Sequence, residues 1–238
     1  TGLGMWGDHW VSLSVRDPQT PDAYIGDPKD WDKAETMLQE VSDDLGLEAK
    51  RIEGEAAIYG PKLDYMFKDA LGKERQLSTI QLDFAMPQRF GLTYRDKDGE
   101  EKTPVMIHRA PVGSMERFVA ILLEHTGGNF PLWLMPTQAI ILSISEKYEK
   151  YAEKVLNLLE NNEIRALVDY RSETMGKKIR DAEVNKTPYM LIIGEQEAEN
   201  GTISVRKHGG EDLGSITIED FSKLINTEIK STLKEFIV

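Results

Sequence analysis

The residues that could carry chemistry in this chain are scattered, and none of them forms a self-contained catalytic motif. The sequence holds no G-x-S-x-G nucleophile elbow, P-loop, dinucleotide-binding glycine pattern or H-E-x-x-H metal motif. Its four histidines, His9, His108, His125 and His208, do not provide two metal ligands at a local spacing. Taken alone, each of them is more simply interpreted as a structural or exposed residue.

One cation stands at a position suited to nucleotide binding. Arg117 falls in the first turn of a predicted helix, SMERFVAILLEHT, for which Ser114 is a suitable N-cap. A guanidinium there can stack on an aromatic base and pair with phosphate oxygens. The residues alone favour the simpler alternative, in which Arg117 pairs with Glu116 or Glu124.

Strand patterns dominate the first half of the chain. Residues 10–15 alternate apolar and polar side chains, which is the period-2 mark of a half-buried strand. Residues 31–45 repeat apolar side chains at helical spacing after an Asp-rich start, which predicts a helix. The pattern as a whole predicts an α+β fold with an antiparallel sheet. Its further strands are predicted at residues 57–67, 78–84 and 105–110, and a hairpin turn at Asp98-Gly99.

The second half alternates strands and helices. The stretch FPLWLMP at residues 130–136 places two prolines around an apolar anchor, which suits an ordered linker. We therefore expect domains at residues 1–134 and 135–238. The second is predicted to be an α/β domain with a five-stranded mixed sheet and three helices, the first of them capped by Ser145. Its strands are predicted at residues 138–144, 165–168, 189–193, 203–206 and 216–218, and its helices at 148–159, 174–185 and 221–236.

Composition excludes several classes of protein. The 238 residues include no cysteine, so the chain forms no disulfide and supplies no thiolate to zinc. A net charge of −12 argues against a protein that coats nucleic acid non-specifically, although a local basic patch can still bind RNA. The sequence has no run of 18 apolar residues and no signal-peptide pattern. We therefore expect a cytoplasmic protein without a membrane partner.

Several longer phrases of the sequence stand out. The first half contains EGEAAIYGPKLDY, STIQLDFAMPQRF and PVMIHRAPVGSMERFVAILLEH, and the second contains FPLWLMPTQAIIL, DYRSETMGKKIR and KTPYMLIIGEQE. Together they resemble the threonyl-tRNA synthetase family, in the family's order and over nearly the whole chain. The resemblance implies the last part of a class II catalytic domain, with its motif 3, followed by a complete anticodon-binding domain.

The resemblance also implies an activity. Such enzymes use ATP with Mg²⁺ to convert L-threonine to threonyl-adenylate, and they transfer the threonine to tRNA(Thr). The family's motifs 1 and 2, which form the homodimer interface and clamp the α-phosphate, are not found in this sequence, which opens on Thr1. We therefore expect a portion of a homodimeric parent enzyme that is monomeric and inactive alone.

Specific residues match substrate-binding positions of the family. Arg117 and Gln76 would bind ATP and, with Lys62, take part in catalysis; Tyr59, Gln81, Ser114 and His108 would bind threonine or the acceptor end. Adenylate formation transfers AMP to a carboxylate and releases pyrophosphate, so positioned cations are expected to supply much of the catalysis. The Gly60-Pro61 turn would present Tyr59 and Lys62.

His108 also resembles the family's third zinc ligand. Zinc would recognise the amino and hydroxyl groups of threonine, and would reject valine because valine has no hydroxyl. The other two ligands of the family, a Cys and a His, are expected upstream. The zinc site is therefore predicted to be incomplete in this chain.

In the second half, Arg180, Glu197 and Arg206 match positions that read anticodon bases, because Arg can stack on a base and hydrogen-bond its edge. Lys177 and Lys178 are expected to contact phosphates, and a solvated helix face is the equally weighted alternative for both. Ser172 and Thr174 depart from an asparagine and a lysine found in some members of the family. This departure puts two base contacts in doubt.

A second function from a different class stays open. A non-catalytic accessory or paralogous protein could use a class II-like core to bind structured nucleic acid. An accessory protein has no reason to keep side chains that contact small substrates. Retention of all six such residues favours the synthetase: Tyr59, Lys62, Gln76, Gln81, His108 and Arg117.

Overall fold

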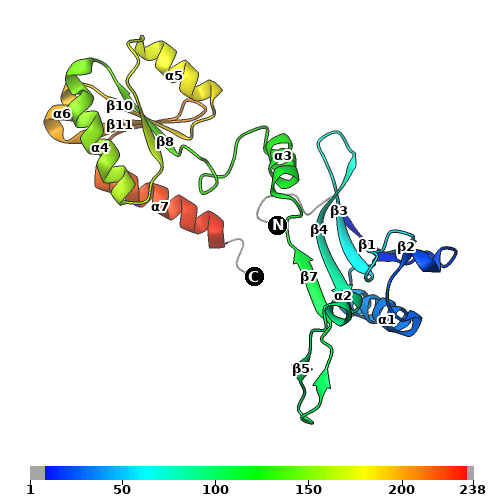
Figure 1. Cartoon of the computed structure of the whole chain (residues 1–238). Coiled ribbons are helices and arrows are strands. Elements are labelled where there is room, and N and C mark those ends of the chain that lie inside the picture. Colours follow the sequence, from blue (N-terminus) through cyan, green and yellow to red (C-terminus); the bar gives the residue numbers. More distant parts are fainter. Residues whose placement is uncertain (1–8, 235–238) are drawn as a thin grey trace. The chain divides into compact units, whose positions relative to one another are not determined.

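The computed structural model describes residues 9–234 of the chain (Figure 1). Contacts divide the chain into two compact units, the first ending at His125 and the second beginning at Thr126. The domain boundary expected between residues 134 and 135 stays a prediction. Residues 1–8 of the first predicted domain and residues 235–236 of the last predicted helix lie outside the described residues.

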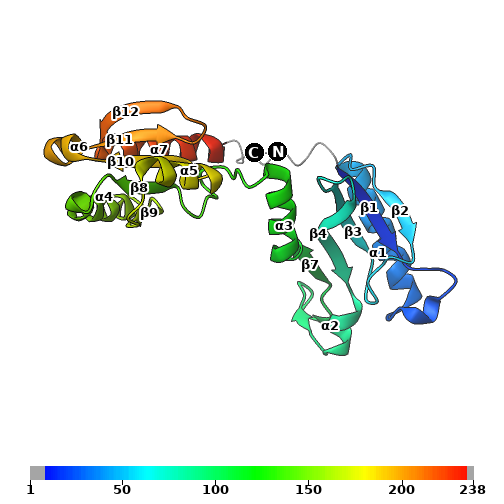
Figure 2. The same cartoon turned by 90° about the horizontal axis from the view of Figure 1, so that it is seen from above.

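The first unit contains a five-stranded sheet in the order β2-β1-β3-β4-β7, in which only the β1–β2 pair is parallel. Figure 2 shows β1, β3, β4 and β7 side by side. The strands are β1 (His9–Val15), β2 (Lys50–Glu53), β3 (Lys62–Lys68), β4 (Glu74–Asp83) and β7 (Met106–Ala110). The helices are α1 (Pro28–Asp44), α2 (Ala85–Arg89) and α3 (Met115–Thr126), with a 3-10 turn η2 (Pro21–Ala23). A separate hairpin pairs β5 (Tyr94–Arg95) with β6 (Glu101–Lys102).

This fold confirms the predicted α+β class and differs from the prediction in several details. The strand expected from residue 57 begins only at Lys62, because Ala57 and Gly60 form an isolated bridge within a turn. The strand expected from residue 78 begins at Glu74, directly after a turn in which Asp69 N donates to Lys73 O at 2.9 Å. Strand β2 and the five-residue helix α2 were not predicted from the sequence.

The two faces of the first sheet differ in chemistry. Val11, Leu13 and Leu63 are at most 2% exposed and pack with Leu38 of α1. Ile121 of α3 packs with Leu77 and Phe67 in a second cluster. Because side chains alternate along a strand, the neighbouring residues of β1 and β3 project from the other face. These residues are Ser12, Ser14, Lys62 and Asp64, so that face is polar.

The second unit is an α/β domain whose mixed sheet has the order β12-β11-β10-β8-β9, with β8, β9 and β10 parallel. Its strands are β8 (Ala139–Ser143), β9 (Ala166–Asp169), β10 (Tyr189–Ile193), β11 (Thr202–Lys207) and β12 (Asp212–Thr217). Its helical elements are η3 (Glu146–Tyr148), α4 (Glu149–Asn161), α5 (Met175–Val184), α6 (Glu195–Asn200) and α7 (Ile218–Lys234).

The five strands and mixed pairing confirm the prediction, whereas the helix count was too low. The structure adds α6, a fourth helix, whose sequence EQEAEN buries no residue and so carries no apolar stripe for pattern reading. The last strand covers residues 212–217 instead of 216–218, because Ile218 begins α7. None of the helices within residues 9–234 is long and apolar enough to span a bilayer.

Helices cover both faces of the second sheet, with α5 on the opposite side from α4 and α7 (Figure 1). The larger core cluster joins Ile141 of β8 to Val155 of α4 and Phe221 of α7. The smaller one joins Met190 of β10 to Ala182 of α5. All five side chains are at most 2% exposed.

The proline-bracketed stretch attaches to the second unit. Leu132 belongs to the larger core cluster. The buried Gln138 side chain donates to Leu132 O at 3.0 Å. Arg165 donates to Met135 O at 2.9 Å and to Trp133 O at 2.9 Å. These contacts hold residues 132–135 in an ordered conformation, as the apolar anchor predicted.

Candidate functional site

A row of polar residues crosses three neighbouring strands of the first sheet. Lys62 of β3 lies opposite Gln81 of β4, and Gln81 lies opposite His108 of β7. Directly paired residues share a face of a sheet, so these three side chains project from the same polar surface. Residues from separate segments of the sequence are thereby brought together.

Tyr59 joins this row through the turn that precedes β3. A Cβ on Gly60 would lie 1.7 Å from Leu82 O, so only glycine permits this close approach to β4. Leu82 N donates to Pro61 O at 3.0 Å and closes the contact. The hydroxyl of Tyr59 donates to Gln81 Oε1, and its ring centroid lies 5.4 Å from that of His108. Burial and, secondarily, the Asp83 carboxylate raise the pKa of Tyr59.

Asp64 connects Lys62 to Gln76. Its Oδ2 accepts from Lys62 Nζ at 2.5 Å, and its Oδ1 accepts from Gln76 Nε2 at 2.6 Å. Gln76 reaches this face because the β3–β4 register shifts between Tyr65 and Met66, so that Met66 lies opposite Gln76. Such a bulge re-aims the residues beyond it to the other side of the sheet.

Asp83 holds His108. Its carboxylate is 1% exposed and lies 2.8 Å from His108 Nε2, whereas the His108 side chain is 41% exposed. The other carboxylate oxygen accepts from Met86 N at 2.9 Å at the start of α2. A carboxylate behind a ring nitrogen is the usual support of a metal-binding histidine. Within the described residues, however, no group of three His, Cys, Asp or Glu side chains could hold a metal ion.

Arg117 and Ser114 sit where the β7–α3 loop runs along β4. The guanidinium Nη1 of Arg117 donates to Gln76 O at 3.1 Å, and Arg117 N donates to Ser114 Oγ at 3.2 Å. Gly113 has φ +65, and a Cβ there would lie 2.3 Å from Leu77 O. In the described part of the chain, no ion pair joins Arg117 to Glu116 or Glu124. Ser114 caps the helix, and Arg117 is fixed beside the bulge.

Sequence reasoning did not single out Asp64 and Asp83. Both are buried, at 4% and 1% exposure, and each contacts a residue that the family resemblance had named. A signal was available for Asp64, because it is the one acidic residue of the β3 sequence and forms an i, i+2 pair with Lys62. Asp83 gives a weaker signal, as an acidic residue at a strand end.

The expected RNA-contacting residues of the second unit fall in different environments. Arg180 and Lys177 are exposed on α5, where Lys177 pairs with Glu173 at 2.5 Å. Lys178 is 4% exposed, and its Nζ donates to Ser143 O at 3.2 Å and Asp169 O at 3.0 Å. The expected phosphate contact is therefore wrong for Lys178, because its ammonium is buried between β8 and β9.

Arg206 lies opposite Met190, which packs under α5, so Arg206 projects from the face that α5 partly covers. Its buried Nε has no hydrogen-bond partner among the described residues. Glu197 lies beyond the other end of β10, where its carboxylate accepts from Gly194 N at 2.9 Å. The structure therefore places Arg206 on the α5 side of the sheet and separates it from Glu197, which lies beyond the opposite end of β10.

The structure also locates Ser172 and Thr174, the two residues that differ from some members of the family. Thr174 is the N-cap of α5, and its hydroxyl accepts from Lys177 N at 3.4 Å. Ser172 is exposed in the loop before it. Thr174 therefore supports the helix that carries Lys177 and Arg180.

Two protein families match the two units. Residues 22–126 match the tRNA synthetase class II core domain (G, H, P, S and T), and residues 138–228 match the anticodon binding domain. These ranges include every candidate site residue discussed above.

Individual relatives give the same assignment. The chain is 62% identical over 230 residues to a threonine–tRNA ligase of Flavobacterium johnsoniae, covering 96% of the chain and 36% of that protein. It is 53% identical over 226 residues to the Bacteroides fragilis enzyme, covering 95% of the chain and 35% of the relative. A crystal structure of the RNA binding domain of threonyl-tRNA synthetase from Cryptosporidium parvum has a TM-score of 0.82 and 39% identity, over 95% of this chain and 56% of that one.

The chain therefore spans little more than a third of the length of these two bacterial relatives. Its two units match the class II core and the anticodon-binding domain in that order along the sequence. The high identity extends through both of them. The chain belongs to the threonyl-tRNA synthetase family.

Proposed function

We propose that this chain is part of a threonine–tRNA ligase, in which the first unit supplies one side of the aminoacylation site. The observation that carries this proposal is the row formed by Lys62, Gln81 and His108 on one sheet face. Tyr59 is held against that row by Gly60. These four residues match substrate-binding positions of the family.

In the proposed reaction, a carboxylate oxygen of threonine attacks the α-phosphorus of ATP, and the bond to pyrophosphate breaks. Negative charge on the phosphates would be stabilised by Lys62 and Arg117. Arg117 is already anchored to β4 through Gln76 O, so its guanidinium loses little freedom on binding ATP. Gln76 would contact ATP or the adenylate, and Gln81, Tyr59 and Ser114 would contact threonine. Mg²⁺ bound with ATP would neutralise part of the phosphate charge.

We also propose that the whole enzyme binds zinc and that this chain supplies one of the zinc ligands. His108 would supply a ring nitrogen, and the carboxylate of Asp83 orients the ring through the other nitrogen. A zinc ion held with further ligands of the whole enzyme would coordinate the amino and hydroxyl groups of threonine. It would thereby discriminate against valine.

The second unit would bind tRNA(Thr). Arg180 and Arg206 would contact anticodon bases from the α5 side of the sheet, and Lys177 would contact phosphate. Glu197 would contact a base that reaches beyond the end of β10. We further propose that the whole enzyme is a cytoplasmic homodimer and that the 238 residues alone are monomeric.

ATP–pyrophosphate exchange tests this function. A longer protein that contains this chain and family motifs 1 and 2 is expected to exchange pyrophosphate in the presence of threonine, and far less with valine. The 238 residues alone are expected to show no exchange above background. Exchange that depends on another amino acid would contradict the assignment. Absence of exchange in the longer protein would instead favour an accessory protein that binds structured RNA.

A further inference from the structure

Asp64 is the point at which the polar face of the first sheet is held together. It lies on β3 at 4% exposure, in contact with residues of three strands. Ser14 Oγ of β1 donates to Oδ2 at 3.0 Å, and Ser12 Oγ lies 3.0 Å from Ser14 Oγ. Lys62 Nζ shares Oδ2, and Gln76 Nε2 donates to Oδ1 at 2.6 Å. Both carboxylate oxygens are therefore occupied by donors.

The charge at this position fixes which end of the Gln76 amide faces outward. An ionised carboxylate only accepts hydrogen bonds, so Gln76 must turn its NH₂ group toward Asp64. The carbonyl oxygen Oε1 of Gln76 then points away from Asp64. A ligand on this face would therefore meet the Gln76 carbonyl oxygen as a hydrogen-bond acceptor, while one N–H of the amide is taken up by Asp64.

The same carboxylate limits the position of Lys62. A lysine side chain has four rotatable bonds and loses considerable conformational freedom when it is fixed. The Lys62 side chain is 14% exposed, and its ammonium contacts Asp64 at 2.5 Å. The ion pair thus places the cation in advance and reduces the entropy lost on binding a phosphate.

We propose that Asp64 is a positioning residue of the aminoacylation site, which holds the Lys62 ammonium and orients the Gln76 amide with its carbonyl oxygen toward the ligand. This inference rests on the proposed function of Lys62 and Gln76. Asp64 itself contacts neither substrate. Its effect on the reaction passes through its two neighbours.

The orientation of the Gln76 amide is tested on the 238-residue chain by nuclear magnetic resonance. In the unchanged chain, the side-chain NH₂ protons of Gln76 are expected to shift downfield and to exchange slowly with solvent. Both features should be lost in Asp64→Asn. An asparagine has a single side-chain oxygen, which the Lys62 ammonium would take, and its NH₂ group would then face Gln76 in place of an acceptor. Fast exchange in the unchanged chain would overturn the proposed orientation, whatever the protein's activity.

The catalytic consequence is tested in the longer synthetase by pyrophosphate exchange. Asp64→Asn is expected to lower kcat/KM about 10- to 100-fold, as supporting residues behind a site commonly do. The same substitution should have little further effect when Lys62→Met and Gln76→Met are already present, because residues that act as a unit are not additive. Additive effects in that combination would overturn the positioning role.

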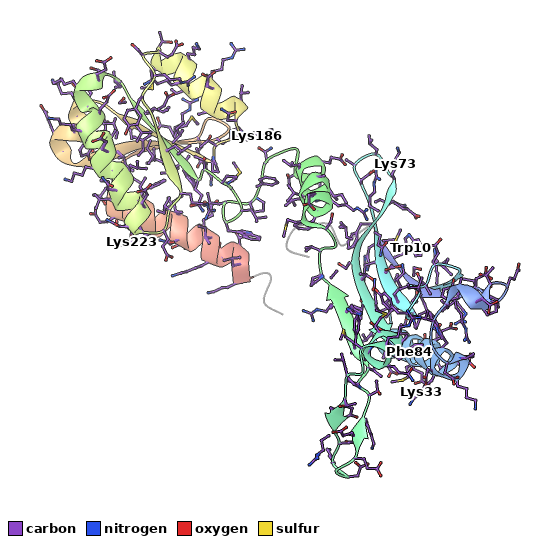
Figure 3. The ribbon with its side chains drawn as sticks, in the orientation of Figure 1. Trp10, Lys33, Lys73, Phe84, Lys186 and Lys223 are labelled. Atoms are coloured by element: carbon purple, nitrogen blue, oxygen red, sulfur yellow. The ribbon has the colours of Figure 1, made fainter. Side chains whose placement is uncertain are left out.

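Asp69→Asn is the matched control. Asp69 is 8% exposed and its carboxylate lies 3.0 Å from Arg75 Nε. Asp69 lies with Lys73 in the turn of the β3–β4 hairpin, before β4 begins. Phe84, labelled in Figure 3, marks the opposite end of β4. Asp69→Asn should lower the thermal midpoint while leaving kcat/KM within about twofold at a permissive temperature. If Asp64→Asn behaves in the same way, the role of Asp64 is only structural and the inference fails. Failure of exchange in the unchanged synthetase would count against the proposed function, and the amide measurement would still decide the orientation.

Discussion

At the scale of single residues, Arg117 shows how the fold prepares a cation for a ligand. It extends from the first turn of α3 and donates to Gln76 O at 3.1 Å, while its side chain stays exposed. The hydrogen bond holds the guanidinium in place through Nη1 without neutralising its charge, because the carbonyl oxygen that accepts it is uncharged. The cation is therefore positioned and still available to a phosphate or a base.

Arg117→Ala is expected to reduce kcat/KM for threonine-dependent exchange about 10²- to 10³-fold in the longer enzyme, because a positioned transition-state contact is lost. The control is Arg109→Ala. Arg109 is an exposed residue of β7 paired with Ile80, on the sheet face opposite His108. Equal losses for the two arginines would contradict an ATP-binding role for Arg117.

Lys177 and Lys178 are neighbours in the sequence and are expected to behave differently. Lys177→Ala should weaken tRNA binding and reduce the salt slope of log K by about 1, since one phosphate contact disappears. Lys178→Ala should instead lower the free energy of unfolding by about 1–3 kcal/mol, because Ser143 O and Asp169 O lose their donor. Filter binding at several salt concentrations and urea unfolding separate the two. The reverse assignment would refute this account of α5.

At the scale of elements, the turn before β3 positions two of the proposed substrate-binding residues, Tyr59 and Lys62. Gly60 is packed against the backbone of β4, with no space for a Cβ. Tyr59 and Lys62 flank the Gly60-Pro61 pair, and both point at neighbours on the polar face. The position of the turn is thus coupled to the geometry of the site.

Gly60→Ala is expected to destabilise the first unit by about 1–3 kcal/mol, since the added methyl group forces the turn away from Leu82 O. Gly176→Ala is the control, because Gly176 lies within α5 with no atom near the added Cβ. It should be neutral or stabilise by about 0.5–1 kcal/mol. Calorimetry of both variants provides the comparison, and an unchanged midpoint for Gly60→Ala would contradict the tight packing.

Tyr189 links two elements of the second unit. It is fully buried on β10, and its hydroxyl donates to Glu228 Oε2 of α7 at 2.5 Å. Burial, followed by the hydrogen bond to Glu228 and its negative charge, raises the pKa of Tyr189. The folded chain therefore binds this proton more tightly than the unfolded chain, whose tyrosine pKa is about 10.

It follows that stability falls as the pH rises above about 10, because the unfolded state then releases the proton and the folded state does not. Tyr189→Phe should lower stability at neutral pH by about 1.5–3 kcal/mol, through the loss of a hydrogen bond to a charged group. The same variant should show a shallower decline between pH 9 and 11 (roughly one unit either side of the free tyrosine pKa). Urea unfolding over that range measures both effects, and an unchanged slope would contradict the raised pKa.

Elements of strong periodicity were predictable from the sequence, and their exact ends were less so. Strand β1 and helix α1 were predicted from their apolar spacing, but their burial follows that spacing only in part. Ser12 and Ser14 of β1 are buried like their apolar neighbours, whereas Met37 and Val41 of α1 are exposed. Gln76 could not be placed on the same face as Asp64 by counting, since the bulge at the β3–β4 register shift inverts the alternation there. Lys178 was misplaced because composition does not distinguish a lysine that donates to buried carbonyls from one on a solvated helix face.

At the scale of the whole molecule, the chain combines two compact units that match a class II core and an anticodon-binding domain. Of the proposed site residues, Lys62, Gln81 and His108 lie on the polar sheet face of the first unit, and Lys177 and Arg180 lie on α5 of the second. The sequence motifs were sufficient to identify the family. The supporting roles of Asp64 and Asp83 became visible only in the three-dimensional structure. Residue roles that depend on contacts between distant segments required the three-dimensional arrangement.

The central claim is that this chain belongs to a threonine-specific synthetase and reads the anticodon of its tRNA. The most direct test is equilibrium binding of the 238-residue chain to a tRNA(Thr) transcript and to transcripts that differ only in anticodon bases, at fixed salt. Each altered base that is read directly should weaken binding by about 1–3 kcal/mol, and Arg206→Ala should remove that discrimination. Equal affinity for all the transcripts would contradict the claim.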